Sequence, residues 1–161
     1  MMVHTPVRGA APVGHLSDLN PASAAAVLYF RLWQTGSTTR AKVGDDFIAG
    51  LGPNAGQRAF DTFAELCDML ARYGRRPFVA HSIGCKCLGG DEACLAHFID
   101  CAATGDREEA MLIATLMVRV DITPMLVAHA ANVGLAIKRM GLSAPRHLVR
   151  AIQTTASPHL H

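Results

Sequence analysis

The sequence predicts an all-α fold, a single-domain bundle of about six helices with one irregular segment at residues 75–90. Three observations lead to this prediction. The alternation of polar and apolar residues that is typical of half-buried strands is almost absent, and glycine, proline and asparagine recur where helices would begin and end. Half of the 161 residues are hydrophobic, which suits one core, and the chain is short for two full domains. We therefore expect an N-terminal extension over residues 1–19, a helical domain over 20–155 and a C-terminal tail over 156–161.

Caps and periodicity place the six helices along the chain. Asn20 followed by Pro21 is an N-cap and first-turn pair. Between Pro53 and Tyr73, apolar side chains recur at intervals of three and four residues. Asp106, with a glutamate three residues later, resembles a capping box. The predicted helices cover residues 20–33, 53–73, 91–103, 107–118 and 123–140, and the last begins near residues 143–145.

The densest chemical signal is the segment 81–101, which holds four of the five cysteines and two histidines. Zinc is bound by four sulfur and nitrogen ligands in a tetrahedron. Cys85 and Cys87 can both reach one ion from a tight turn, because glycines flank them. Cys94 lies in the first turn of the next predicted helix, where the helix dipole favours a thiolate. The predicted zinc ligands are therefore Cys85, Cys87, Cys94 and either His81 or His97.

The remaining cysteines, Cys67 and Cys101, are assigned to the core. Seven helical residues separate Cys101 from Cys94, which corresponds to about 10.5 Å along a helix axis. Their two sulfurs cannot share one zinc ion unless that helix breaks. The same separation argues against an iron–sulfur cluster, which would need all four thiolates. Cysteine is also a frequent core residue, so burial explains both positions.

The predicted function is that of a zinc-binding protein of non-catalytic, regulatory or adaptor type, in which the ion fastens residues 75–90 to the following helix. A zinc-dependent hydrolase is an alternative, with an open ligand position for water and Asp91 or Glu92 as general base. Neither HExxH nor the zinc deaminase signature is present, however. Acidic residues also suit a helix N-terminus for its dipole, so the sequence favours a protein that is not an enzyme.

Thiol redox chemistry is a further alternative for the same segment. Cys85 and Cys87 form a CxC pair, Cys94 would be a thiolate of low pKa, and His81 could accept a proton. The absence of a CxxC motif disfavours a dithiol oxidoreductase, and a metal centre accounts better for the histidines. Redox sensing therefore stands as an alternative to zinc binding.

DNA binding is a second alternative, because residues 135–152 resemble a helix-turn-helix motif. A helix ends at Gly141, a short Leu-Ser turn follows, and the next helix carries Arg146 and Arg150. The register departs from the usual one, since Ile137 stands where an alanine is expected. A pair of amphipathic helices with a solvated basic face is the favoured interpretation of this segment.

Charge and hydropathy suggest a location and a class of partner. Residues 122–161 carry four basic and no acidic residues, although the formal net charge is only +2, which is a weak basis for an anionic partner. The first 19 residues lack the apolar region of a secretory signal, and polar residues interrupt the most apolar stretch, 111–137. We therefore expect a cytoplasmic protein that does not enter a membrane. The aromatic stripe of the first helix would form core or a subunit contact, so we expect a protein partner or a homodimer.

Overall fold

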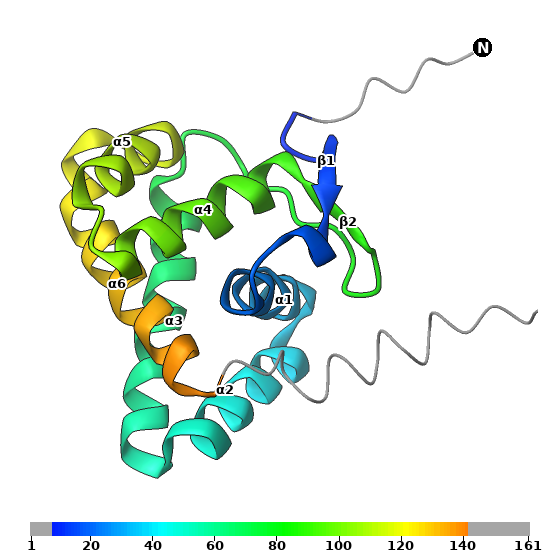
Figure 1. Ribbon diagram of the computed structural model, residues 1–161, viewed down its shortest axis with the longest axis vertical. Coiled ribbons are helices and arrows are strands. Elements are labelled where there is room, and N and C mark those ends of the chain that lie inside the picture. The colour runs from blue at the N-terminus through cyan, green and yellow to red at the C-terminus, as the bar shows by residue number, and fades with distance from the viewer. Residues whose placement is uncertain (1–7, 142–161) are drawn as a thin grey trace, which may run out of the picture.

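The computed structural model describes residues 8–141 (Figure 1). These residues form the predicted all-α fold and, in addition, one small sheet. The helices are α1 (Pro21–Thr35), α2 (Ser37–Leu51), α3 (Pro53–Tyr73), α4 (Gly90–Thr104), α5 (Arg107–Met117) and α6 (Thr123–Arg139). The strands are β1 (Pro12–His15) and β2 (Cys87–Gly89), and short 3-10 turns cover Leu16–Asp18 and Val120–Ile122.

Local signals in the sequence account for the ends of several helices. The Asn20 side chain accepts a hydrogen bond from the backbone N–H of Ser23 at 2.9 Å and begins α1. Asp106 caps α5 in the same way, through the N–H of Glu109 at 3.2 Å. Gly105, with φ +88°, ends α4 in the left-handed conformation that glycine adopts readily. The five helices that were predicted before residue 141 are therefore all present.

Helix α2 was not predicted. Its sequence contains glycines and β-branched residues that lower helix propensity, and it buries only a narrow face. Its packing against α3 explains why it forms: a Cβ on Gly56 would lie 2.5 Å from the Cα of Ile48, so only glycine allows this close approach. The helix predicted near residue 143, and with it most of the helix-turn-helix-like segment 135–152, lies outside the described residues.

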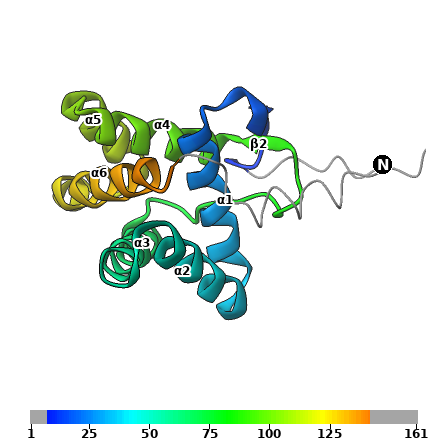
Figure 2. The ribbon, with the colours of Figure 1, turned by 60° about the horizontal axis from the view of Figure 1, so that its bottom comes forward.

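The helices form two groups, which α1 crosses (Figure 2). Helices α4, α5 and α6 lie together, and α2 packs against α3. Aromatic rings join α1 to the second group, with the centroid of Tyr29 5.3 Å from that of Phe47 and 6.5 Å from that of Phe63. Tyr29 and Phe30 are each only 2% exposed, so this part of the predicted aromatic stripe belongs to the core.

Helix α6 contacts α3, α4 and α5 and is the central helix that its apolar sequence predicted. Within residues 8–141, Val120–Arg139 is the one helical stretch that is long and apolar enough to cross a membrane, with a mean hydropathy of 1.4. Buried helices of proteins outside membranes meet the same criterion, and 44% of this stretch is buried against the rest of the fold.

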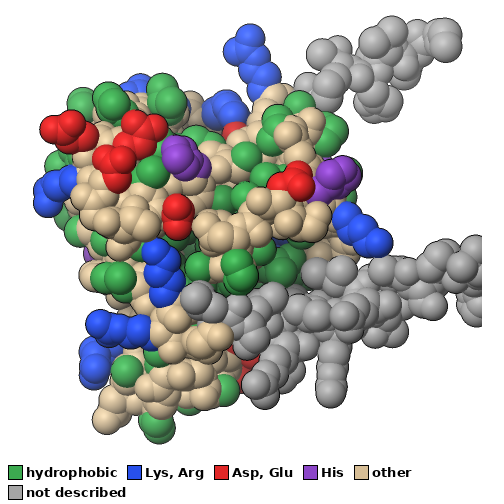
Figure 3. Space-filling view, viewed as in Figure 1, with side chains coloured by type: hydrophobic (Ala, Val, Ile, Leu, Met, Phe, Trp, Pro, Cys, Tyr) green, Lys and Arg blue, Asp and Glu red, His purple; other side chains and the backbone are tan. Residues whose placement is uncertain are grey.

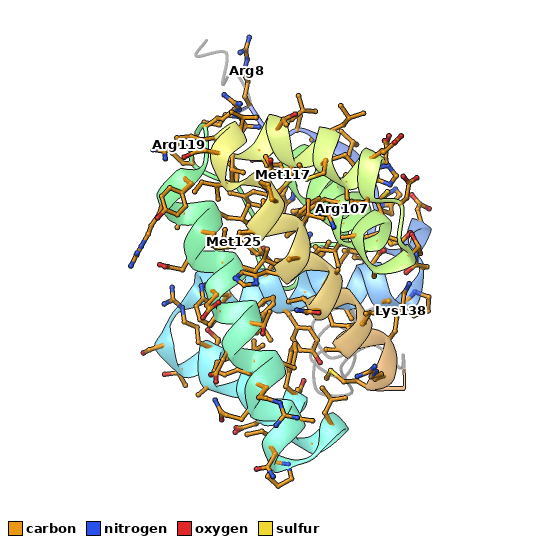
Figure 4. The ribbon with its side chains drawn as sticks, turned by 90° about the vertical axis from the view of Figure 1, so that its left-hand side faces the viewer. Arg8, Arg107, Met117, Arg119, Met125 and Lys138 are labelled. Atoms are coloured by element: carbon orange, nitrogen blue, oxygen red, sulfur yellow. The ribbon has the colours of Figure 1, made fainter. Side chains whose placement is uncertain are left out.

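Large apolar side chains are exposed on α5, on the 3-10 turn Val120–Ile122 and on α6, where Figure 4 labels Met125. These exposed residues are Leu112, Leu116, Val120, Met125 and Leu135. The predicted homodimer stays a prediction.

The small sheet joins two distant parts of the chain. Strand β1 pairs antiparallel with β2, so that His15 lies opposite Cys87 and Gly14 opposite Leu88. Neither strand was predicted, because four and three residues are too few to show an alternating pattern. The sheet lies at the N-terminal end of α4, away from α5 (Figure 1). The predicted N-terminal extension and the predicted irregular segment thus meet at the cysteines.

Candidate functional site

A buried arginine holds the segment that carries Cys85 and Cys87. Arg31 lies on α1, and its side chain is 0% exposed. Its guanidinium donates two hydrogen bonds to the Glu92 carboxylate, at 2.6 and 2.9 Å. The same guanidinium donates to the carbonyls of Ser82, Cys85 and Cys87 at 3.2, 2.6 and 2.7 Å. The buried charge is therefore paired and well supplied with acceptors. In this structure Arg31 and Glu92 make the connection between the loop and α4 that was predicted for zinc.

Two neighbouring carboxylates in the first turn of α4 anchor the ends of this segment. Glu92, only 1% exposed, also accepts hydrogen bonds from the backbone N–H groups of Gly89 at 3.0 Å and His81 at 3.3 Å. Asp91 is 8% exposed and pairs with Arg76, whose Nη1 lies 2.9 Å from Oδ2. Because their oxygens are engaged in these contacts, the arrangement does not favour either acid as the general base of a hydrolase.

A turn brings the Cys85 thiol to the His81 ring. The backbone N–H of Cys85 donates to the carbonyl of Ser82 at 3.0 Å, and the turn places Cys85 Sγ 3.4 Å from His81 Nδ1. The other ring nitrogen, Nε2, lies 2.7 Å from the carbonyl oxygen of Ala10. A carbonyl can only accept, so the hydrogen-bond network assigns a proton to Nε2 and leaves Nδ1 of the neutral ring as an acceptor facing the thiol. His81 is thus oriented from one side and faces a nucleophile on the other.

The pKa values of this pair move toward each other. The hydrogen bond to Cys85 raises the pKa of His81, burial opposes this change, and the Ala10 carbonyl adds to it. The hydrogen bond with His81 lowers the pKa of Cys85, burial opposes this, and the amide and thiol of Cys87 lower the pKa further. A thiol with a lowered pKa is a better nucleophile at neutral pH, because more of it is thiolate. Cys85 is therefore the cysteine of this segment whose surroundings favour the thiolate.

Cys87 lies two residues farther along, at the start of β2. It is partly exposed, as is Cys85, and the exposed Lys86 lies between them. Arg31 holds the carbonyls of both cysteines on the buried side of the loop. All five cysteines of the chain are free, so both thiols are available for chemistry.

Cys94 lies on a different face of α4 from Glu92, the residue through which the helix holds the cysteine loop. It lines a cavity between α3, α4 and α5 together with Leu70, Phe78 and Met117. Burial raises its pKa, the charge of Asp91 raises it further, and Arg76 opposes both. The predicted thiolate of low pKa at Cys94 is therefore wrong, because burial and the charge of Asp91 disfavour the charged form of the thiol.

His97 lies in the middle of α4, with 61% of its side chain exposed. Its two ring nitrogens lie 3.7 and 3.8 Å from Cys101 Sγ, and its Nε2 lies 3.6 Å from a carboxylate oxygen of Glu109. Figure 3 shows acidic side chains gathered over the α4–α5 end of the molecule, with a histidine beside them. Burial raises the pKa of Cys101, and nearby negative charges, among them Asp106 and Glu109, raise it further.

The predicted core positions of Cys67 and Cys101 are confirmed, since both are buried in the hydrophobic core. Among residues 8–141 there is no group of three or more His, Cys, Asp or Glu side chains arranged to hold a metal ion. The structure brings His81 and Cys85 together, with Cys87 on the same loop, and leaves Cys94 and His97 elsewhere on α4. The predicted ligands were His81, Cys85, Cys87, Cys94 and His97. Zinc binding stays a prediction.

Two contributors to this site escaped the sequence analysis. Ala10 acts through its carbonyl, so its side chain gave no signal. Arg31 did leave one, because it is a single charge in the apolar run 24–33 of α1. A charge in such a run is buried with the rest of the helix, and a buried charge needs a partner of opposite charge. No protein-family model matches the chain, and no curated protein or solved structure is significantly similar to it.

Proposed function

We propose that this protein is a thiol redox sensor in which Cys85 is the reacting thiol and His81 its proton acceptor. One observation carries the proposal: His81 Nδ1 lies 3.4 Å from Cys85 Sγ while Nε2 is held 2.7 Å from the Ala10 carbonyl. A nucleophile, a base and a third group that orients the base form the arrangement that activates cysteine and serine nucleophiles generally. The lowered pKa of Cys85 supports the same assignment.

The oxidant we propose is a hydroperoxide. The Cys85 thiolate attacks the outer oxygen, an S–O bond forms, the O–O bond breaks, and the alkoxide or hydroxide leaves with the proton held by His81. Cys87 then attacks the sulfur of the Cys85 sulfenic acid, and the hydroxide leaves as water with the Cys87 proton. The two thiols are oxidised to a disulfide, and the hydroperoxide is reduced to an alcohol and water. His81 supplies the proton acceptor and Cys87 the resolving thiol.

The position of Cys85 supports a sensor over an enzyme with a bound substrate. Two cavities that the described residues line have volumes of about 320 and 430 Å³, and both lie around Arg76 and Phe78. Cys85 lines neither of them and lies on a loop at the edge of the fold. A sensor needs access to a small oxidant and a fixed thiol geometry, and it needs no substrate cavity. We place this chemistry in the reducing cytoplasm, where free cysteine pairs persist.

Mass spectrometry of the full chain after treatment with hydrogen peroxide tests the proposal. The wild-type protein and the control variant Cys94→Ser are expected to lose two hydrogens, and the bond should map to Cys85 and Cys87. The Cys87→Ser variant is expected to stop at a sulfenic acid on Cys85. Oxidation that begins at Cys101, or a Cys85 no more reactive than free cysteine, would rule the proposal out.

Zinc binding is the second candidate, and a different aspect of the same pair favours it. Metal-bound histidines usually donate their other ring N–H to a carbonyl or carboxylate, and His81 Nε2 lies against the Ala10 carbonyl while Nδ1 faces Cys85. The remaining predicted ligands on α4 would have to move to complete a tetrahedron. Elemental analysis of the purified protein decides between the candidates. One zinc per chain that is lost in Cys87→Ser supports the metal site, whereas metal-free protein with reactive thiols supports the sensor.

A further inference from the structure

We propose that the state of the Cys85 thiol controls the attachment of the N-terminal segment, and that a disulfide with Cys87 releases residues 8–15 from the helical body. The inference rests on the proposed redox function and adds its output, a segment that is bound in the reduced protein and free in the oxidised protein. Four observations on the described residues support it, and each concerns the contacts of this segment.

The N-terminal segment is attached almost entirely to the cysteine loop and the start of α4. The N–H of Leu16 donates to the carbonyl of Lys86 at 3.0 Å, beside the pairing of β1 with β2. The N–H groups of Gly90 and Asp91 donate to the carbonyls of Ala11 and Gly9 at 3.0 and 2.9 Å. The ring of His81 holds Ala10 in the same way at 2.7 Å. Arg76, which lies before the loop, also donates to the carbonyl of Arg8 at 3.2 Å. The other hydrogen bonds that tie residues 8–16 to the rest of the fold are made to the loop of the two cysteines and the residues next to it.

Backbone hydrogen bonds, and not buried side chains, hold this segment. The residues of β1 are exposed except Gly14, and the Val13 side chain is 61% exposed. The fit is nevertheless close: a Cβ on Gly89 would lie 2.8 Å from His81 Nε2, and one on Gly9 would collide with the Asp91 carboxylate. A segment held by a few exposed hydrogen bonds opens with a small free energy, and a close fit makes it sensitive to small shifts of its neighbours.

Disulfide formation constrains the backbone that β1 pairs with. A disulfide joins Cβ atoms about 3.8 Å apart through a restricted dihedral angle, so a bond between residues two positions apart closes a small ring that includes the backbone of Cys85, Lys86 and Cys87. The Lys86 carbonyl in this ring accepts from Leu16, and Cys87 lies opposite His15. The same bond removes the Cys85 sulfur from His81 Nδ1.

The hydrogen bonds on the two sides of the loop differ in strength, and this difference determines which side opens when the disulfide forms. On the inner side, the carbonyls of Cys85 and Cys87 are held by Arg31, which is fully buried and paired with Glu92. On the outer side, only β1 and its exposed hydrogen bonds hold the loop. The buried arginine network is the costlier of the two to break, so the constraint that the disulfide ring imposes on the loop is relieved by losing β1.

Hydrogen exchange followed by mass spectrometry tests the inference on the full chain, before and after peroxide treatment. Peptides that cover residues 8–19 and 88–93 are expected to exchange at least about tenfold faster in the oxidised protein, as the loss of one or two hydrogen bonds implies. Peptides from α3 should not change. The Cys87→Ser variant, which cannot close the disulfide, should keep slow exchange at both places.

Mapping of the disulfide and alkylation of Cys85 distinguish failure of this inference from failure of the proposed redox function. A mapped Cys85–Cys87 disulfide with unchanged exchange at residues 8–19 overturns the inference and leaves the sensor intact. If no disulfide forms, the sensor proposal fails, and alkylation of Cys85 with iodoacetamide then tests the coupling directly by displacing its sulfur from His81. Faster exchange of residues 8–19 in the alkylated protein supports control by the Cys85 thiol, and unchanged exchange overturns it.

Discussion

The chain contains two histidine–cysteine pairs with the same spacing of four residues, and they have opposite properties. In the first, His81 Nδ1 lies 3.4 Å from Cys85 Sγ, and the pKa of the cysteine is lowered. In the second, both nitrogens of His97 lie 3.7 to 3.8 Å from Cys101 Sγ, and the pKa of the cysteine is raised. The spacing brings sulfur and imidazole together in both places and does not by itself make a reactive thiol.

Orientation is the first difference between the two pairs. The Ala10 carbonyl fixes the ring of His81, so that one nitrogen is directed at the thiol. His97 projects from α4 with 61% of its side chain exposed, and neither nitrogen is closer to the sulfur than the other by more than 0.1 Å. A hydrogen bond needs a nitrogen lone pair or N–H directed at its partner, so only the first ring interacts strongly with its cysteine.

Charge is the second difference. Cys101 lies beside the acidic first turn of α5, whose carboxylates disfavour a thiolate. At the start of α4, near the cysteine loop, Asp91 and Glu92 are each paired with an arginine, so their negative charge is compensated. A helix can therefore supply the correct spacing and still suppress the reactivity of its cysteine.

Replacing Arg31, which holds the loop of the His81–Cys85 pair, should have the largest effect on stability. Arg31→Met leaves the buried Glu92 carboxylate and three loop carbonyls without their donor, so the free energy of unfolding is expected to fall by about 3–5 kcal/mol. Urea unfolding measures this change. Arg72→Met is the matched control, because it removes an exposed pair with Asp68 and should cost less than about 1 kcal/mol.

Equal losses in the two arginine variants would contradict the assigned role of Arg31. Should the Arg31→Met protein not fold, Arg31→Lys provides a milder change. Lysine keeps the charge without the planar fork, so the variant should still lose more stability than Arg72→Lys.

The difference in alkylation rate between Cys85 and Cys101 should be the next largest effect. We expect Cys85 to react with iodoacetamide at least about tenfold faster than Cys101 in the folded protein, because its thiolate is stabilised and more accessible. His81→Gln is expected to remove most of this advantage. The matched variant His97→Gln should leave the Cys101 rate within about twofold of the wild type.

Rates read by peptide mapping distinguish these outcomes. A His81→Gln variant in which Cys85 reacts as fast as before would show that the ring does not activate the thiol. Equal rates for Cys85 and Cys101 in the wild-type protein would show that the two pairs do not differ in solution.

The smallest expected effect is at the second pair. Glu109→Gln removes one of the charges that raise the pKa of Cys101, so the alkylation rate of this cysteine should rise by about twofold and that of Cys85 should not change. Because burial is the first cause of the raised pKa, the variant does not make Cys101 as reactive as Cys85. A slower reaction at Cys101 would contradict the electrostatic explanation.

Much of the fold could be predicted from local signals, and much of the site could not. Asn20 and Asp106 mark helix starts through bonds to residues three positions away, and Cys67 and Cys101 were correctly placed in the core. The α2 helix was missed because its propensity is low and its stability comes from packing on α3. The thiolate was assigned to Cys94 because the helix dipole is visible in the sequence, whereas the burial that outweighs it is not.

The sequence by itself determined five of the six helices in residues 8–141, the core cysteines and the segment in which cysteines and histidines are concentrated, because those features depend on neighbours within a turn of helix or a short turn of chain. Only the tertiary structure decided which cysteine faces an oriented histidine. The Ala10 carbonyl that orients His81 is 71 positions away in the chain, and Arg31 is 54 positions from the Cys85 carbonyl that it holds. A ring's orientation and a thiol's electrostatic surroundings are properties of assembled neighbours, and no local spacing contains them.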